Sequence, residues 1–222
     1  MGQRIGGHLP DAYSVHVLFI LFFLSLAQSQ TKSGTVIVLG FSDRKVVLAA
    51  DSRESTDEGD YRDEGCKISA LENKLVFTAS GKARIGDWEA TSEARSALQA
   101  VGIRQNYTSE HLDTIATKWG TAAGRKIIAR RGSEKVKDGQ VLITGVFIGA
   151  DDMGRTNIAQ QTIRARVSGG SVSFRKSPVV NAYRTPIMNF TAIGEANITD
   201  EFKAAVSLRS KEWRAQFPVY AE

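Results

Sequence analysis

The sequence predicts an α+β domain in which strands and helices are grouped in blocks and pack as layers. A strand-rich block comes first, a block with helical periodicity follows, and a second strand-rich block precedes a last helical stretch. Segregated blocks of this kind are typical of helices packed outside sheets. The 222 residues of the chain are enough for one such domain with a sizeable core.

An apolar run of eleven residues, 17–27, lies near the N-terminus and follows a short stretch that contains Arg4. The run is shorter than the roughly 20 apolar residues of a membrane-spanning helix, and it suits the central region of a secretory signal. Small residues permit cleavage after Ala27 or after Ser29. No second apolar run in the sequence approaches membrane length.

We therefore expect a signal peptide over residues 1–29, a short propeptide over 30–34 and a folded domain over 35–222. The predicted location is secreted or periplasmic, with no stable membrane span after signal removal. If the N-terminal segment is not a signal, a cytoplasmic location is the alternative.

The first strand block contains two pairs of short runs. Residues 35–39 (TVIVL) and 45–50 (KVVLAA) predict one hairpin, with its turn at 41–44, and residues 66–69 and 74–79 predict a second pair. Because VVLAA is a near-continuous apolar run, it predicts a strand that is covered on both faces.

The central block has apolar residues near the helical period. Trp88, Ala94 and Leu98 predict a helix over residues 86–100, and a second helix is predicted from Thr108, as an approximate N-cap, to about residue 131. Four further strands and a last helix are expected over residues 140–148, 157–163, 166–174, 189–193 and 200–213.

Charge and composition exclude several classes of function. The net charge is +5, and the basic residues are spread along the chain, so no nucleic-acid partner is expected. One Cys and three His exclude an intramolecular disulfide and a zinc site built from several Cys and His ligands. We expect no metal and no cofactor. His111, the one His outside the leader, is expected to be an exposed helix residue.

Three polar residues interrupt strands that otherwise read as buried. Thr35 starts the first strand, Asp51 follows VVLAA sixteen residues later, and Lys67 comes sixteen residues after that. A charge at the end of a core strand is unfavourable unless it is paired. Asp51 and Lys67 on neighbouring strands can pair with each other, so a plain strand-end salt bridge is the structural alternative to a catalytic site.

These residues belong to four short motifs: Gly34-Thr35, AADSR around Asp51, CKI around Lys67, and TASG, whose Gly81 follows Thr35 by 46 residues. In this spacing the chain resembles the β-type subunits of the proteasome and their bacterial relatives in the N-terminal nucleophile (threonine) hydrolase superfamily. The later segment IGADDMGRTNIAQQTI is similar to the family's GxDxxG segment, and the resemblance extends over about residues 34–200. It implies a four-layer αββα sandwich.

The resemblance also implies a role for each matching residue. The Gly34-Thr35 bond would be cut autocatalytically, and Thr35 would become an N-terminal nucleophile whose own α-amine acts as the base. Lys67 would assist the proton transfer electrostatically, with Asp51 orienting it. The backbone N–H of Gly81 would be the oxyanion donor.

Further positions match residues around the family's site. Arg53 is expected to pair near the catalytic residues, and Ser55, Gly81 and Ala83 match positions that hold the substrate backbone as an added strand. The pocket for the residue before the cleaved bond matches four positions, whose two carboxylates and small floor favour a basic side chain: Glu54, Gly65, Ala79 and Asp87.

The chain departs from the family pattern in two places. The turn at Ile193-Gly194-Glu195 lacks the Ser that orients the amine, and no Asp-x-x-Ser-Gly element occurs before Glu222. The predicted domain is therefore short at its C-terminus, with Glu195 as an alternative amine partner.

The resemblance implies a peptide or protein substrate, and assembly of identical subunits, as in the rings that family members form. Two alternatives are open. The chain is either a catalytically inactive proteasome-like structural subunit or exported binding protein, or an amidase that acts on a small molecule.

Overall fold

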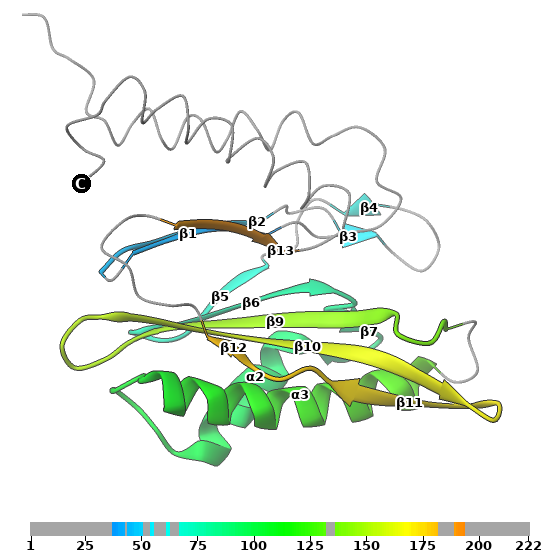
Figure 1. The fold of residues 1–222 in the computed structure, drawn as a ribbon. Helices are drawn as coiled ribbons and strands as arrows, with labels where there is room; N and C mark the ends of the chain where they lie inside the picture. The colour runs from blue at the N-terminus through cyan, green and yellow to red at the C-terminus, as the bar shows by residue number, and fades with distance from the viewer. Residues whose placement is uncertain are drawn as a thin grey trace, which may run out of the picture. The chain divides into compact units, whose positions relative to one another are not determined.

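A computed structural model describes residues 37–42, 44–50, 54–55, 61–62, 67–131, 136–181 and 189–193. All of them belong to one unit of the chain, Ser33–Glu222. The described part contains helices and mostly antiparallel sheet, so the predicted α+β class is confirmed (Figure 1). The signal peptide, the propeptide and the last predicted helix lie outside the described residues.

The larger sheet has six strands. Five of them follow the order β11-β10-β9-β6-β5, and the short β12 pairs with β10. The strands are β5 (Ile68–Glu72), β6 (Leu75–Gly81), β9 (Val141–Ala150), β10 (Thr156–Ser168), β11 (Ser171–Lys176) and β12 (Val180–Asn181). The predicted second hairpin is confirmed, since β5 and β6 are antiparallel neighbours.

The smaller sheet has the order β13-β1-β2, with β1 at Ile37–Phe41, β2 at Val46–Ala50 and β13 at Asn189–Ile193. β1 and β2 form the first predicted hairpin, and the predicted bounds of β13 are those observed. Two short pairs complete the strands of the described residues: β3 (Glu54–Ser55) with β4 (Tyr61–Arg62), and β7 (Arg84–Ile85) with β8 (Trp88–Glu89).

The described residues contain two helices, α2 (Ala90–Val101) and α3 (Ser109–Arg131). The predicted cap of α3 is confirmed, because the hydroxyl of Thr108 accepts the N–H of His111 at 3.3 Å. The prediction that the first helix begins at residue 86 was wrong, since Gly86 has a positive φ of 57° and forms a turn. Trp88 is buried as the prediction assumed, but it lies in strand β8 and not in a helix.

Two strand predictions need correction. The runs 157–163 and 166–174 were expected to be separate, but β10 continues through both to Ser168. The break falls at Gly169 and Gly170, whose φ values of 56° and 78° form a two-residue hairpin turn of the type that matches strand twist. Polar residues inside the run did not end the strand, because pairing with β9 and β11 satisfies its backbone.

The prediction that β2 is covered on both faces was also wrong. Val47 is 38% exposed, and the other residues of β2 are only partly buried. β9 is the strand that is covered on both faces, since all of residues 142–149 are buried. The difference arises because β2 is an edge strand of its sheet, while β9 lies between β6 and β10.

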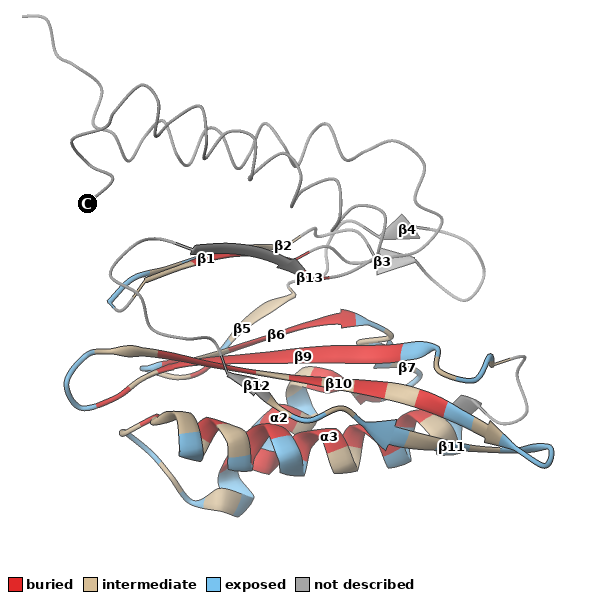
Figure 2. Cartoon of the chain, viewed as in Figure 1, coloured by how far each residue is buried: buried red, intermediate tan, exposed pale blue. Residues whose placement is uncertain are grey.

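The two faces of the larger sheet belong to different cores (Figure 2). On one face, apolar residues of β6, β9 and β10 pack against α2 and α3. On the other, Val146, Ile148 and Ile158 pack against Ile37 and Leu39 of β1. Alternation of side chains along each strand explains how one strand serves both cores. Within the described residues, neither helix has the length and apolarity to cross a membrane.

Trp119 of α3 is the centre of the helix-side core. Its ring lies 5.5 Å from that of Phe77 and 5.9 Å from that of Phe147, between ring centroids. The indole lies over Gly145 of β9, where an added Cβ would be 2.5 Å from a ring carbon of Trp119. Gly145 is therefore one of the positions that let the helix approach the sheet closely.

We predict that Gly145→Ala destabilises the domain by about 1–3 kcal/mol, because the new methyl forces the indole out of its packed position. Urea unfolding followed by Trp fluorescence measures this loss. The matched control is Gly169→Asn, which substitutes a turn glycine that has no neighbour within 4 Å. Asn tolerates positive φ, so the control is expected to change stability by less than about 0.5 kcal/mol. Equal stability of the two variants would contradict the packing argument.

Candidate functional site

Gly81 ends β6 and is the best-defined residue of the predicted site. Its φ is 96°, in the region that favours glycine, and an added Cβ would lie 2.7 Å from the carbonyl oxygen of Leu142. Both constraints demand glycine here. Gly81 is exposed, so its backbone is accessible from solvent at the end of the strand.

The register of the sheet sets the direction of the Gly81 N–H. Lys82 donates its N–H to Leu142 at 3.1 Å, and Gly81 pairs with Ile143. Bonded and non-bonded pairs alternate in an antiparallel ladder. Gly81 therefore occupies a non-bonded position, and its N–H points away from β9, to the edge of β6 along which β5 runs.

Lys67 lies on that same side. It directly precedes Ile68, the first residue of β5, and Ile68 pairs with Thr78 of β6. Lys67 is thus placed beside the last residues of β6, close to the strand end at Gly81. The structure brings these two predicted site residues together through one hairpin.

Ala79 and Ala83 flank Gly81. Ala79 is buried on the helix side of β6, where it belongs to the same core as Trp119. The N–H of Ala83 donates to the carbonyl of Gly81 at 2.8 Å, and the carbonyl of Ala83 accepts the N–H of Ala90, also at 2.8 Å. Because Trp119 Nε1 donates to the Ala90 carbonyl at 3.1 Å, the segment after Gly81 is tied to the core.

Asp87, another of the predicted pocket residues, lies in the turn between β7 and β8. Its side chain is 86% exposed, and its carboxylate lies 2.5 Å from the guanidinium of Arg130 on α3. The hydrogen bond and the charge of Arg130 lower the pKa of Asp87. The structure thus places Asp87 in a surface ion pair, and its role in substrate recognition stays a prediction.

The rest of the predicted site is described in part or not at all. Ser55 lies in β3, paired with Tyr61 of β4, next to Glu54. The other predicted site residues, with the alternative amine partner, lie outside the described residues: Gly34, Thr35, Asp51, Arg53, Gly65 and Glu195.

His111 differs from its predicted exposed state. It is only partly exposed, in the first turn of α3, and its Nδ1 lies 2.5 Å from the carbonyl oxygen of Asn106. Since a carbonyl only accepts, Nδ1 is the protonated ring nitrogen. This contact fixes the ring against the loop before α3.

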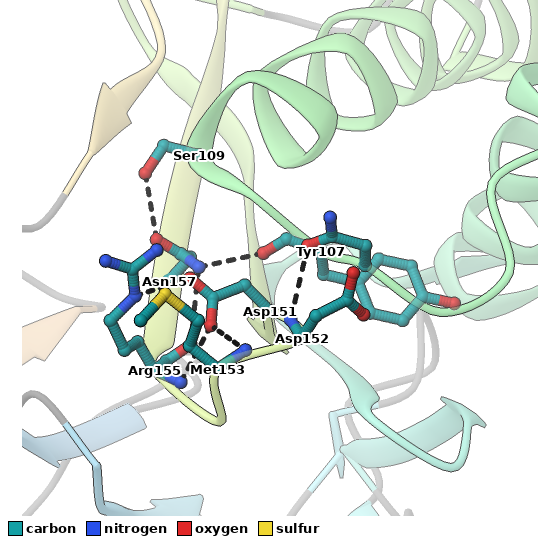
Figure 3. Close-up of polar contacts among 8 residues, drawn as sticks. Tyr107, Ser109, Asp151, Asp152, Met153, Arg155 and Asn157 are labelled. Carbon is teal, nitrogen blue, oxygen red and sulfur yellow. Dashed lines mark hydrogen bonds and ion pairs between the residues drawn. The ribbon is translucent and has the colours of Figure 1, made fainter.

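The sequence did not predict a buried polar network around the turn after β9 (Figure 3). Asp151 is almost fully buried, and its carboxylate accepts the N–H groups of Met153 and Arg155 at 3.0 and 2.9 Å and the Nε of Arg155 at 2.8 Å. Nearby, the side chain of Asn157 donates to the carbonyl of Tyr107 at 2.9 Å and accepts from Ser109 at 3.0 Å. An Asp followed by Gly three residues later was the available signal for this turn.

Burial of the Asp151 carboxylate opposes its charge, but the hydrogen bonds and the charge of Arg155, with the N–H of Met153, outweigh burial and lower its pKa. A charged group that is buried and fully hydrogen-bonded is typical of a structural turn. We therefore assign this network a structural role, the stabilisation of the turn after β9.

Tyr107 lies at the same end of the sheet, where its N–H donates to the carbonyl of Ala150. Its hydroxyl donates to Glu72 at 2.6 Å, and burial, followed by the neighbouring carboxylate, raises its pKa. A shallow hollow of about 510 Å³ lies beside this contact, lined by Glu72, Asn73, Lys74, Arg104 and Gln105. It adjoins the β5–β6 turn, whereas Gly81 is at the other end of β6, so the hollow is separate from the predicted site.

Comparison of the sequence with protein-family models and with curated proteins finds no match. The family resemblance therefore depends on the motifs and their spacing alone.

We predict that Asp151→Asn destabilises the domain by about 1–3 kcal/mol at pH 7, since the amide leaves the Arg155 and Met153 donors poorly satisfied. A lowered native pKa stabilises the fold at pH values above the unfolded pKa of about 3.9, and this contribution is lost as the pH falls through the native pKa. The difference between wild type and variant should therefore shrink in acid.

Chemical denaturation between pH 3 and pH 7 measures this difference. Asp152→Asn is the matched control, because Asp152 is exposed and only its backbone N–H is engaged, with Asn106. A pH-independent loss in Asp151→Asn would show that the side-chain charge has no part in the turn.

Proposed function

We propose that this protein is a threonine-type peptidase or amide hydrolase related to proteasome β subunits. It is processed at Gly34-Thr35, and Thr35 becomes the N-terminal nucleophile. The proposal includes the four-layer αββα sandwich, of which the helix layer and the two packed sheets among the described residues are consistent parts. The substrate is a peptide or protein.

The observation that carries the proposal is the strand end at Gly81. An exposed glycine offers a backbone N–H that is turned away from β9, on the side where Lys67 lies. A hydrolase needs such a donor where negative charge develops on the substrate carbonyl oxygen, and one donor contributes about 10²–10³ in rate. The sequence motifs assign both of these residues to the proposed site.

The proposed reaction follows from this arrangement. The Thr35 hydroxyl oxygen attacks the substrate carbonyl carbon, and the α-amine of Thr35 takes the hydroxyl proton. The oxyanion, held by the Gly81 N–H, collapses and expels the leaving amine, which receives that proton. Water then hydrolyses the resulting ester, with the α-amine again as base. An α-amine has an unperturbed pKa of about 7.7–8.0, so a large neutral fraction is present near pH 7.5.

Lys67 and Asp51 support the nucleophile in this proposal. The ammonium of Lys67 stabilises the negative charge that develops on the Thr35 oxygen as its proton leaves. The Asp51 carboxylate keeps Lys67 charged and oriented, and Arg53 pairs nearby. Ser55 and Ala83 hold the substrate backbone as an added strand.

The two alternatives to a threonine peptidase that the sequence analysis left open also apply to this proposal. An inactive structural subunit or exported binding protein would keep the fold without cleavage, and a small-molecule amidase would use the same nucleophile on another substrate. Assembly into a homo-oligomer, as a ring, and export to the periplasm or the cell exterior are further parts of the proposal.

We predict that the mature wild-type chain begins at Thr35 and that Thr35→Ala keeps the preceding residues, because the variant lacks the hydroxyl that attacks the Gly34 carbonyl. Intact-mass measurement and N-terminal sequencing of the purified chains test this. Thr31→Ala is the matched control and should be processed as wild type. If wild type and Thr35→Ala both begin near residue 28 or 30, the chain does not process itself and the structural-subunit alternative is supported.

We also predict that Lys67→Gln lowers kcat for cleavage of a fluorogenic peptide by at least about 10², as expected for loss of a preorganised charge at the reacting oxygen. Lys74→Gln removes the same charge from the exposed turn at the far end of the β5–β6 hairpin and should leave kcat unchanged. Similar activity of the two variants would exclude Lys67 from the chemistry.

A further inference from the structure

Two arginines lie directly opposite each other on β10 and β11. Arg164 pairs with Arg175 in the register of these antiparallel strands. Directly opposite side chains are close neighbours on the same face of a sheet, and like charges in such positions repel each other. Pairing of the two strands therefore does not by itself explain why arginines occupy both of these positions.

The face that these arginines share is the one turned away from α3. The adjacent pair, Ile163 and Lys176, faces the helix side: Ile163 belongs to the helix-side core, and the Lys176 ammonium donates to Thr121 of α3 at 2.8 Å. Because side chains alternate along a strand, Arg164 and Arg175 point to the opposite face. Figure 2 shows much of β11 as exposed, and Arg175 is itself exposed.

Both guanidinium groups reach the same turn. Arg164 Nη1 donates to the carbonyl oxygen of Gly139 at 3.1 Å. Arg175 Nη2 lies 3.6 Å from the position of a Cβ built on Gly139. The two groups thus converge on one short segment, and each keeps donors that this turn does not use, since a guanidinium carries five N–H groups.

The surroundings add positive charge. Arg166 lies on the same face, two residues after Arg164, and Lys137 precedes the Gly139 turn; both are exposed. The one acidic group of the turn, Asp138, accepts the N–H of Val167 at 2.9 Å. Within the part of the chain that the structure describes, none of these four cations has a carboxylate within ion-pair distance.

We propose that Arg164 and Arg175 form a binding site for a phosphate group, with Arg166 and Lys137 contributing to its positive potential. Two adjacent guanidinium groups suit the oxygens of a tetrahedral anion, and a doubly charged anion removes the repulsion between them. The ligand is inorganic phosphate or a simple phosphate monoester. This site does not depend on the proposed hydrolase function.

The test is isothermal titration of the full chain with sodium phosphate, at an ionic strength held constant with sodium chloride. Wild type should bind phosphate, and Arg175→Gln should bind it about tenfold more weakly, as expected for loss of one charge-assisted contact. Arg125→Gln is the matched control, because it removes one exposed positive charge from α3 and leaves the site intact. Absence of binding to wild type, or equal binding by Arg175→Gln, would overturn the proposal.

A second measurement tests the repulsion itself. In low-salt buffer without phosphate, Arg175→Gln should melt at a higher temperature than Arg125→Gln, and added phosphate should raise the Tm of wild type more than that of Arg175→Gln. A lower Tm for Arg175→Gln in that buffer would contradict the proposed strain. Titration with glycerol 3-phosphate distinguishes a phosphate monoester from inorganic phosphate as the ligand. An affinity equal to that for inorganic phosphate indicates recognition of the phosphate group alone, and a weaker affinity indicates selection of the free ion.

Discussion

The contact between Trp119 and Gly145 is the constraint on which the rest of the described structure depends. The missing side chain at Gly145 lets the indole rest on β9, and the indole N–H then holds the carbonyl of Ala90 at the start of α2. From Ala90, backbone hydrogen bonds lead through Ala83 to Gly81. A large apolar contact in the core thereby fixes the loop that follows the candidate oxyanion donor.

The central strand β9 gives the domain two different ends. At one end, Ile143 faces Gly81 in a non-bonded pair, so the N–H of Gly81 points toward the edge where Lys67 lies. At the other, the turn after Ala150 is closed by the buried carboxylate of Asp151 and its donors. Buried polar groups with satisfied hydrogen bonds make a rigid frame. The Gly81 end, where that N–H is not paired with β9, is therefore the end at which our proposal places the substrate.

The sequence predicted those parts of the fold that local patterns determine. The two hairpins, the strand over residues 189–193 and the cap at Thr108 follow from apolar runs, turn residues and a hydroxyl before a helix. It could not predict that β10 continues to Ser168 or that Trp88 is buried from a strand, because pairing partners decide both. At the candidate site, motif spacing indicated Lys67 and Gly81, but the direction of the Gly81 N–H required the register with β9.

The position of His111 constrains the choice of base in any hydrolase that uses Gly81. The loop before α3 joins β9 at its far end, where the Tyr107 N–H donates to Ala150. Ile143, opposite Gly81, is seven residues back along the strand, which at about 3.3 Å per residue is about 23 Å. At this separation the imidazole of His111 cannot accept a proton from a nucleophile at the Gly81 end. A hydrolase at the Gly81 end therefore requires another base, and in the proposed mechanism the α-amine of the nucleophile is that base.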